Sequence, residues 1–293
     1  MGLADWFSAF CSDIRVSNTE SISSRYRAIT KRLNTDSWST SSDTAHSLYV
    51  GSYGRNTAID GASDVDMVFE LPASVYGQYD KYTGNGQSAL LQAVRDSIKK
   101  TYSVTNVGAD GQVVQVPFTD GITFEVVPVF LNNAGSYNYP DSNNGGRWRV
   151  TNPRPEIQAI RDRDAQCNGN LIQLCRMMRV WKKTWSVFIG GLLVDTLAYQ
   201  FIDEWEYKNK SYLYYDYMCR DFFRWMSDRD ADQEYWMAPG SGQYVYGKGL
   251  FQYKATRCYN IALEAISHET ATPKREWSAK QKWREIFGTS FPY

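Results

Sequence analysis

The spacing of apolar and polar residues divides the chain into a mixed first half and a helical second half. In the first half, helical spacing occurs in two segments, 6–33 and 87–101. A stretch rich in Ser and Thr at 35–44 predicts a loop. Alternation typical of strands occurs at 47–50, 65–71 and 122–131. Two further short runs, 104–107 and 112–117, flank an Ala-Asp-Gly turn and predict a hairpin.

After Pro153 and Pro155 the pattern becomes almost wholly helical. Six segments have helical spacing: 156–165, 169–184, 190–205, 212–227, 250–267 and 274–287. The pattern therefore predicts an α+β fold in two domains. Residues 1–155 are expected to form a domain with a mixed sheet and an N-terminal helix, and residues 156–293 a helical C-terminal domain. Two domains imply a cleft between them.

Composition and charge narrow the range of partners. The chain has 293 residues, 43% of them hydrophobic and 15% aromatic, which supplies enough apolar surface for a packed core. It has 32 basic and 32 acidic residues, so its formal charge is zero, and the pI is near 6.7. Binding of long DNA or RNA depends on neutralising many phosphates. We therefore expect no long nucleic-acid partner, while small anionic ligands remain compatible with the charge balance.

No segment has the features of a membrane span, a secretory signal or a structural zinc site. The longest nearly uncharged apolar stretch, 186–194, is well short of the ~20 residues that a spanning helix needs. The N-terminus has no basic region of the kind that begins a signal peptide. The five Cys are widely spaced without a C-x-x-C pair, and the only His are His46 and His268. We expect a cytoplasmic protein with reduced cysteines and no membrane partner.

The strongest candidate for chemistry is a glycine–serine turn followed by two aspartates. Gly51 and Ser52 begin the segment Gly-Ser-Tyr-Gly-Arg-Asn-Thr, and Asp64 and Asp66 stand at the head of the next strand. Side chains at i and i+2 of a strand share one face, with Cα atoms roughly 6.6 Å apart, so both aspartates can converge on one hard cation. Mg²⁺ prefers such carboxylates together with phosphate and water oxygens. The turn adds close backbone approach and a hydroxyl suited to holding a phosphate.

A third acid, Glu125, lies in the apolar strand Phe-Glu-Val-Val-Pro. A carboxylate in such a strand is costly to bury unless it pairs with a cation. Read alone, Asp64-x-Asp66 is more often a pair of solvated acids at a strand edge. The upstream turn and the downstream acid together favour a metal site instead.

These residues resemble a known family. Gly51-Ser52, Asp64-x-Asp66 and the strand around Glu125 resemble the signature of polymerase-β-type nucleotidyltransferases. More narrowly, they resemble the bacterial CD-NTases, which are relatives of cyclic GMP-AMP synthase and oligoadenylate synthase. The resemblance covers nearly the whole chain, through segments of the family's helical half at 148–153, 167–181 and 283–288. This chain departs from the pattern at Glu125, where relatives more often carry Asp, and at Arg179, where Lys is common.

The resemblance implies a polymerase-β-like sheet domain and a helical domain that forms the other wall of a nucleotide cleft. It further implies that Asp64, Asp66 and Glu125 are catalytic and bind two Mg²⁺ ions, with Mn²⁺ as an alternative. Gly51 and Ser52 would bind the β- and γ-phosphates. Nucleoside triphosphates, ATP and GTP first and pyrimidine nucleotides as alternatives, would be joined into a cyclic di- or trinucleotide. This second messenger would activate an effector protein in anti-phage (CBASS) signalling in the bacterial cytoplasm.

Two segments of the second half offer further nucleotide contacts. On the predicted helix 170–185, a polar stripe includes Arg176, Arg179 and Lys183. This stripe is either a solvated face or faces the triphosphate, and Arg179 and Lys182 are the residues expected to neutralise the pyrophosphate, with Lys183 as an alternative. Tyr246, with the other aromatics around the Gly-rich loop at 239–249, either stacks on a base or packs in the core or a lid.

Two other functions stay open from the sequence. One is a nucleotidyltransferase that acts without a template on RNA or another acceptor, which would require basic clusters along a path for the acceptor. The other is a catalytically silent nucleotide sensor. The presence of three acids near an anionic ligand disfavours the sensor, because a pure binder gains nothing from them.

Overall fold

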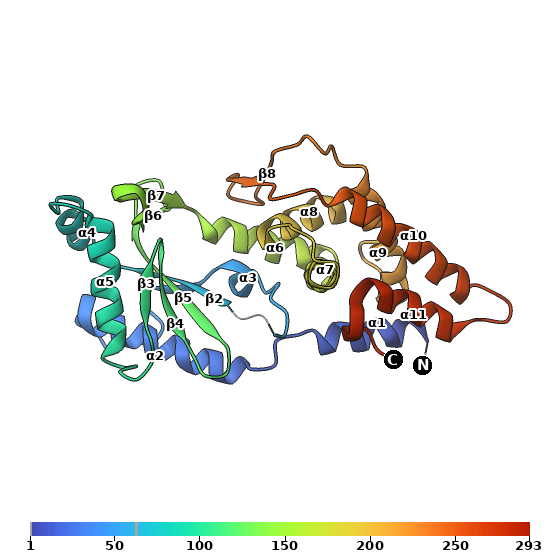
Figure 1. Ribbon diagram of the computed structural model, residues 1–293, viewed down its shortest axis with the longest axis horizontal. Helices are drawn as coiled ribbons and strands as arrows, with labels where there is room; N and C mark the ends of the chain where they lie inside the picture. The colour runs from blue at the N-terminus through green and yellow to red at the C-terminus, as the bar shows by residue number, and fades with distance from the viewer. Residues whose placement is uncertain (1, 62–63) are drawn as a thin grey trace. The chain divides into compact units, whose positions relative to one another are not determined.

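The computed structural model describes residues 2–61 and 64–293, and the chain divides into two compact units (Figure 1). We call the first the sheet unit, which comprises Val16–Gly54 and Gly61–Arg154. We call the second the helical unit, which comprises Met1–Arg15, Arg55–Asp60 and Pro155–Tyr293. Relative to the division expected from the sequence at residue 155, the structure groups two early segments, 1–15 and 55–60, with the helices.

A seven-stranded mixed sheet forms the centre of the sheet unit. Its strands are β1 (Ser47–Tyr49), β2 (Asp64–Glu70), β3 (Gly108–Asp110), β4 (Val113–Pro117), β5 (Thr123–Leu131), β6 (Tyr137–Asp141) and β7 (Arg147–Thr151). The order is β1-β2-β5-β4-β3, with β6 beside β5 and β7 beside β6. The pair β2–β5 is parallel and the other pairs are antiparallel. The mixed sheet predicted from the sequence is confirmed.

Helices α2 (Thr19–Ser37) and α5 (Gly86–Lys99) pack against one face of this sheet. That face is built from alternate residues of each strand, such as Val65 and Met67 of β2 and Phe124 of β5, all of which are buried. The intervening residues lie on the opposite face, where Asp64, Asp66 and Glu125 are at least partly exposed, while Val68 and Val129 further along the strands are buried in a small second cluster. The alternation that builds the core therefore also keeps the candidate acids away from it.

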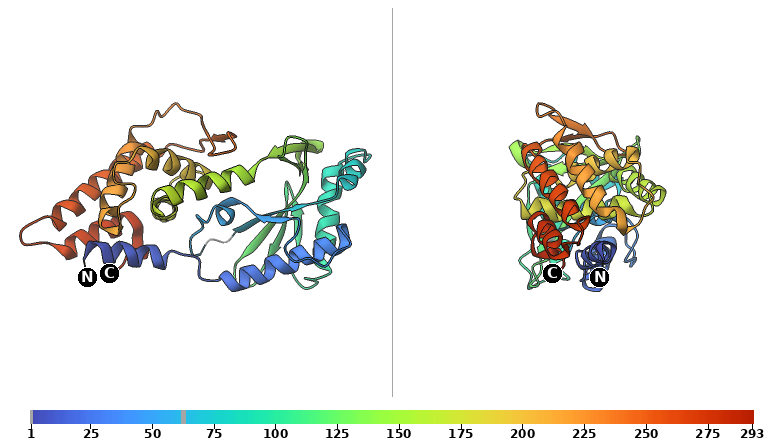
Figure 2. Two further views of the ribbon diagram at one scale, coloured as in Figure 1. Left: turned by 180° about the vertical axis from the view of Figure 1, so that it is seen from behind. Right: turned by 90° about the vertical axis from the view of Figure 1, so that its right-hand side faces the viewer.

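The helical unit consists of seven helices, a small hairpin and two short 3₁₀ turns in its described residues. These elements are α1 (Leu3–Asp13), α6 (Pro153–Gln166), α7 (Asn170–Thr184), α8 (Gly191–Glu204), η2 (Tyr212–Tyr214), α9 (Tyr215–Ser227), β8 (Tyr235–Met237), β9 (Tyr244–Tyr246), α10 (Gln252–Glu269), α11 (Glu276–Phe287) and η3 (Gly288–Ser290). Helix α7 is central, because Leu171, Leu174 and Trp181 are completely buried among its neighbours. In both views of Figure 2, the dark blue helix α1 lies beside the red helix α11 at the end of the chain.

Helix α1 belongs to the helical unit because its aromatic residues pack against the last helix of the chain. The ring centroid of Phe7 lies 5.2 Å from that of Trp283 and 5.3 Å from that of Phe291. The ring of Phe10 lies 4.8 Å from that of Phe287. These contacts explain why the first fifteen residues cluster with Pro155–Tyr293 rather than with the sheet.

The structure differs from the helix expected over 6–33. This segment forms two helices, α1 and α2, separated between Asp13 and Thr19. The apolar residues of α1 lie in the core of the helical unit, whereas Ile22, Ile29 and Leu33 of α2 lie in the core of the sheet unit. Helical periodicity continues across the break, but the two parts bury their apolar stripes in different cores.

Several short elements were not expected from the sequence. These are α3 (Gly51–Gly54), α4 (Ala73–Asp80), η1 (Asn143–Gly145), the strands β6 and β7, and the hairpin β8–β9. The predicted hairpin exists, but its first strand is Gly108–Asp110 rather than 104–107. Among the described residues, no helix combines the length and the apolar character needed to cross a membrane.

Candidate active site

The turn after β1 holds Gly51 directly against Asp66. Gly51 has a φ of +58°, in the left-handed region that favours glycine. A Cβ atom on Gly51 would lie only 2.6 Å from Cγ of Asp66, so any side chain there would collide with the carboxylate. Ser52 follows in the one-turn helix α3. The glycine–serine turn and the second aspartate, which are far apart in the sequence, are therefore in contact.

The pairing of β2 with β5 brings the three acids to one face of the sheet. Asp66 is the direct neighbour of Glu125 in the parallel register, and Asp64 is the neighbour of Thr123. Paired residues of adjacent strands point to the same face, and neighbouring strands lie ~4.8 Å apart. Asp64, Asp66 and Glu125 thus share the face opposite α2 and α5.

Glu125 has a hydrogen-bond partner on the other neighbour of its strand. Nε2 of Gln115 on β4 donates to Oε1 of Glu125 at 3.2 Å. Because β4 and β2 flank β5 on opposite sides, this bond draws the Glu125 carboxylate away from the aspartates. Within residues 2–61 and 64–293, no three His, Cys, Asp or Glu side chains are gathered closely enough to hold a metal ion.

The donor set nevertheless fits a hard divalent cation. All three side chains are carboxylates, which Mg²⁺ and Mn²⁺ prefer, and the backbone positions them on adjacent strands. A change in the side-chain torsions of Glu125 alone would turn its carboxylate from Gln115 towards Asp66. The longer side chain of Glu, compared with Asp, supplies this reach.

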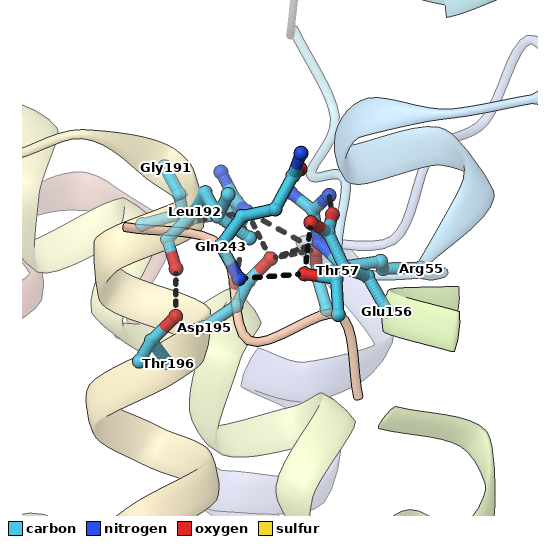
Figure 3. Close-up of polar contacts among 10 residues, drawn as sticks. Arg55, Thr57, Glu156, Gly191, Leu192, Asp195, Thr196 and Gln243 are labelled. Carbon is cyan, nitrogen blue, oxygen red and sulfur yellow. Dashed lines mark hydrogen bonds and ion pairs between the residues drawn. The ribbon is translucent and has the colours of Figure 1, made fainter. Parts of the chain in front are cut away.

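Arg179 and Asp195 belong to a buried ion-pair network of the helical unit. Figure 3 shows Asp195 of this network with Arg55 and Thr57. Asp195, on α8, is completely buried, and its Oδ2 lies 2.7 Å from Nη2 of Arg179 and 2.9 Å from Nε of Arg55. Thr57 Oγ1 donates to the same oxygen at 2.9 Å. Burial alone would raise the pKa of Asp195, but Arg179 and Arg55 outweigh it and hold the pKa below its ordinary value.

This network fixes the segment that follows the glycine–serine turn. Arg55 comes directly after α3, and besides Asp195 it faces Glu156, with Nη1 3.8 Å from Oε2. Burial raises the pKa of Glu156. Arg179 is held from a second side as well, because its Nη2 donates to the carbonyl oxygen of Gly191 at 3.1 Å. Arg179 is therefore committed to Asp195.

Lys182 lies one turn further along α7, among other cations. Partial burial lowers the pKa of Lys182, and the neighbouring charges of Arg179 and Lys248 lower it further. In the part of the chain that the structure describes, neither Lys182 nor Lys248 forms an ion pair with a carboxylate. Two lysines beside an arginine make this spot suitable for an anion.

Tyr246 lies on the exposed face of the β8–β9 hairpin. It is joined there by Tyr235 and Tyr244, whose ring centroids are 4.5 Å apart, while Trp236 and Val245 point into the core. Exposed aromatic rings of this kind can stack on a base. Arg179, Lys182 and Tyr246 all belong to the helical unit, whereas Gly51, Ser52 and the three acids belong to the sheet unit.

Sequence reasoning missed Asp195, Thr57 and Gln115 as structural partners. The sequence does contain a signal for Asp195. This acid ends the apolar run 186–194 and stands among the buried residues of α8. A buried acid in such a run demands cations, here Arg55 and Arg179. Gln115 carried no signal, since its contact with Glu125 depends on the register of β4 against β5.

Comparison with known families identifies the chain. A family model described as "Second Messenger Oligonucleotide or Dinucleotide Synthetase domain" (SMODS) matches residues 1–164, which is more than half of the chain. The matched range contains Gly51, Ser52 and all three acids. The chain belongs to this family. As a SMODS protein it is a nucleotidyltransferase, and the resemblance to the CD-NTases is confirmed.

Relatives of this SMODS chain match over most of its length. A probable cyclic nucleotide synthase of Bacillus cereus is 22% identical over 277 residues, covering 83% of this chain and 81% of that protein. Escherichia coli CdnC, solved in complex with HORMA-deltaN, has a TM-score of 0.70 at 14% identity, covering 99% of this chain and 98% of that chain. Bradyrhizobium diazoefficiens CdnG, solved with GTP, has a TM-score of 0.66 at 12% identity, covering 98% and 95%. These structures show that the SMODS chain has the CD-NTase fold.

Proposed function

We propose that this chain condenses nucleoside triphosphates into a cyclic di- or trinucleotide in a Mg²⁺-dependent reaction. The observation that carries the proposal is the face of the sheet on which Asp64, Asp66 and Glu125 lie together, with Gly51 against Asp66. The family match and the name of the Bacillus cereus relative support the same reaction class. The product would be a second messenger that activates an effector protein in anti-phage (CBASS) signalling in the bacterial cytoplasm.

In this proposal each residue of the sheet unit has a separate role. Asp64, Asp66 and Glu125 would hold two Mg²⁺ ions, with Mn²⁺ as an alternative. When bound, the metal would neutralise charge on the triphosphate and acidify the attacking ribose hydroxyl. Gly51 and Ser52 would bind the β- and γ-phosphates through backbone amides and a hydroxyl. Glu125 would exchange its bond to Gln115 for a place beside Asp66.

The helical unit would supply the positive charge for the leaving pyrophosphate. Arg179 and Lys182 are the two candidates. Lys182 is the better one, because the Arg179 guanidinium is committed to the buried Asp195. Lys248 lies near Lys182 and would add to the same charge. Tyr246 would stack on a base.

The reaction balances as one phosphoryl transfer for each bond of the ring, two for a cyclic dinucleotide and three for a cyclic trinucleotide. A ribose hydroxyl of one nucleotide attacks the α-phosphate of a second in line; the bond from the α- to the β-phosphate breaks, and pyrophosphate leaves. In the same way, the free hydroxyl of the linear product later attacks its own 5′ α-phosphate, which closes the ring and releases another pyrophosphate. ATP and GTP are the first substrates to test, because solved relatives were obtained with ATP and with GTP.

The test is incubation with all four α-labelled nucleoside triphosphates and Mg²⁺, followed by phosphatase treatment and mass spectrometry. We expect a phosphatase-resistant cyclic product whose rate of formation falls at least about 10²-fold in Asp64→Asn/Asp66→Asn. The control is Asp96→Asn on α5, which removes a carboxylate that is exposed and paired only with its neighbour Arg95. A product that forms equally fast in the double variant would exclude this site.

A second candidate, a nucleotide sensor without turnover, is favoured by one observation. The described carboxylates are not gathered into a metal-binding group, and Glu125 is bonded to Gln115. Calorimetry separates the two functions. Nucleotide binding without any product in the four-nucleotide assay would identify the sensor, and turnover that is lost in Glu125→Gln would exclude it.

A further inference from the structure

A cavity lies wholly within the helical unit, and three acids are among the residues that line it. Its volume is about 630 Å³, within the range typical of small-molecule sites. The first residues of α1, the η2–α9 junction, the end of α10 and the start of α11 surround it. Its charged lining residues are Asp216, Glu269, Lys274 and Glu276.

Asp216 is a buried carboxylate with little compensation. Its residue surface is only 4% exposed, at the start of α9. Within the described part of the chain, it accepts one hydrogen bond, from the amide nitrogen of Tyr217 at 2.8 Å, and forms no ion pair. Burial raises its pKa to about 6. A buried carboxylate of this kind is stabilised by a positive charge placed next to it.

Glu269, on helix α10, is a second buried carboxylate that lacks part of its compensation. It is 8% exposed at the last position of α10, where the helix dipole is negative and a carboxylate is unfavourable. Its Oε1 accepts a hydrogen bond from Nζ of Lys274 at 2.9 Å. Its Oε2 is buried and, in the residues that the structure describes, has no hydrogen-bond partner. A donor inside the cavity would satisfy this oxygen.

The remaining lining residues favour an organic cation over a metal ion. Three acids face a single cation, Lys274, so the cavity carries a negative excess. Tyr214 and Tyr217 add aromatic rings, and Arg220 already lies 4.5 Å from the ring centroid of Tyr217. Within the described ranges, no group of His, Cys, Asp or Glu is arranged to hold a metal.

We propose that this cavity binds a small organic cation with primary ammonium groups, and that Asp216 and Glu269 are its carboxylate partners. An ammonium group donates up to three hydrogen bonds, enough to reach both carboxylates. The aliphatic part of the ligand would lie against the tyrosines. This site is separate from the acid face of the sheet unit, so its test does not depend on nucleotide turnover.

The experiment is isothermal titration of the full chain with 1,4-diaminobutane in amine-free buffer. The uncharged 1,4-butanediol is the ligand control, because it has nearly the same length without the charge. The variants Asp216→Asn and Glu269→Gln keep the side-chain shape and remove one charge each. Glu204→Gln is their matched control, because Glu204 is an exposed acid on α8 that does not line the cavity.

We expect saturable binding of the diamine, no binding of the diol, and a Kd weakened at least about tenfold in Asp216→Asn or Glu269→Gln but not in Glu204→Gln. Circular dichroism of each variant checks that it is folded. The proposal is overturned if the wild-type chain does not bind the diamine, if the diol binds equally well, or if neither cavity variant changes the Kd. Displacement of the diamine by equimolar Mg²⁺ would identify a metal site instead.

A pH series adds a readout that a purely structural role would not change. The titratable and charged groups around the cavity are Asp216 and Arg220 on α9, Glu269 on α10, Lys274 in the following loop, Glu276 on α11, and Tyr214 and Tyr217; the charge of Arg220 favours the ionised form of Asp216. A bound cation displaces the proton of Asp216, so binding should strengthen from about pH 5 to about pH 7 in the wild type. In Asp216→Asn this strengthening should be lost.

Discussion

At the scale of single residues, the contact between Gly51 and Asp66 leaves no room for a side chain at position 51. Two independent reasons require glycine: the backbone has a positive φ, and the Asp66 carboxylate occupies the space of a Cβ atom. A substitution at Gly51 therefore acts at once on the turn and on Asp66, the acid proposed to bind metal. This makes Gly51 a point where folding and catalysis can be tested separately with the right control.

Gly51→Ala should lower both the stability and the rate of product formation. The control is Gly121→Ala in the same unit, since Gly121 also has a positive φ, +86°, but nothing lies within 4 Å of its Cβ position. The control should lose about 1 kcal/mol of unfolding free energy from backbone strain alone and keep its activity. Gly51→Ala should lose about 1–3 kcal/mol more from the collision and at least about tenfold in kcat.

Urea unfolding gives the free energies, and the four-nucleotide assay gives kcat. If Gly51→Ala and Gly121→Ala behaved alike in both measurements, the collision with Asp66 would have no role.

The shared face of Asp64 and Asp66 is predictable from strand alternation alone. The pairing of Asp66 with Glu125 and the bond from Gln115 are not, because they depend on which strands become neighbours.

At the scale of elements, Asp195 joins α8 to α7 and to the segment 55–60. Two guanidinium groups, of Arg55 and Arg179, and the hydroxyl of Thr57 converge on one buried carboxylate. The segment after the glycine–serine turn is therefore anchored by charge in addition to the apolar packing of Ala58 and Ile59. Removing the carboxylate would leave two cations buried without their counter-ion.

Asp195→Asn should cost about 3–5 kcal/mol of unfolding free energy, as expected for a broken buried ion pair. The matched control is Asp203→Asn at the end of the same helix, where the ion pair with Arg163 leaves Asp203 54% exposed and should be worth at most about 1 kcal/mol. Denaturant unfolding measures both. Equal losses in the two variants would show that the buried network does not stabilise the unit more than a surface pair.

The elements that the sequence predicted best are long and strongly periodic. The segment 169–184 corresponds to α7, Asn170–Thr184, because its apolar stripe is continuous and fully buried. The sequence predicts a glycine-rich loop over 239–249, where the structure has β9, and it gives no signal for β8, because each strand of this hairpin has three residues and buries a single side chain. The apolar pattern does not indicate the break between α1 and α2. Both helices keep helical spacing, although their apolar residues pack in different cores.

At the scale of the whole molecule, buried acids make the stability depend on pH in opposite directions. Asp195 has a lowered pKa in the folded state, so its stabilising effect is present above the pKa of the unfolded chain and is lost as the pH falls. Asp216 has a raised pKa, about 6 against an ordinary 3.8. The unfolded chain gives up this proton at lower pH, so Asp216 destabilises the fold as the pH rises through this range.

Asp216→Asn should therefore stabilise the chain at neutral pH. In phosphate buffer without amines, we expect the variant to exceed the wild type by about 2 kcal/mol at about pH 7.5 and to match it near pH 4. Thermal or urea unfolding over this pH range measures the difference. A variant that is less stable than the wild type at both pH values would show that the Asp216 carboxylate is already compensated inside the fold.

The packing of Phe7 and Phe10 against Trp283, Phe287 and Phe291 sets an order on biosynthesis. Helix α1 is translated before the sheet unit, but its aromatic partners are translated only after the whole sheet unit and most of the helices. Until then, the apolar residues of α1 lack their native partners in the nascent chain, where chaperones can bind them. The strands of the sheet unit and the helices that cover them are translated one after another. This unit can therefore fold before the aromatic partners of α1 have been synthesised.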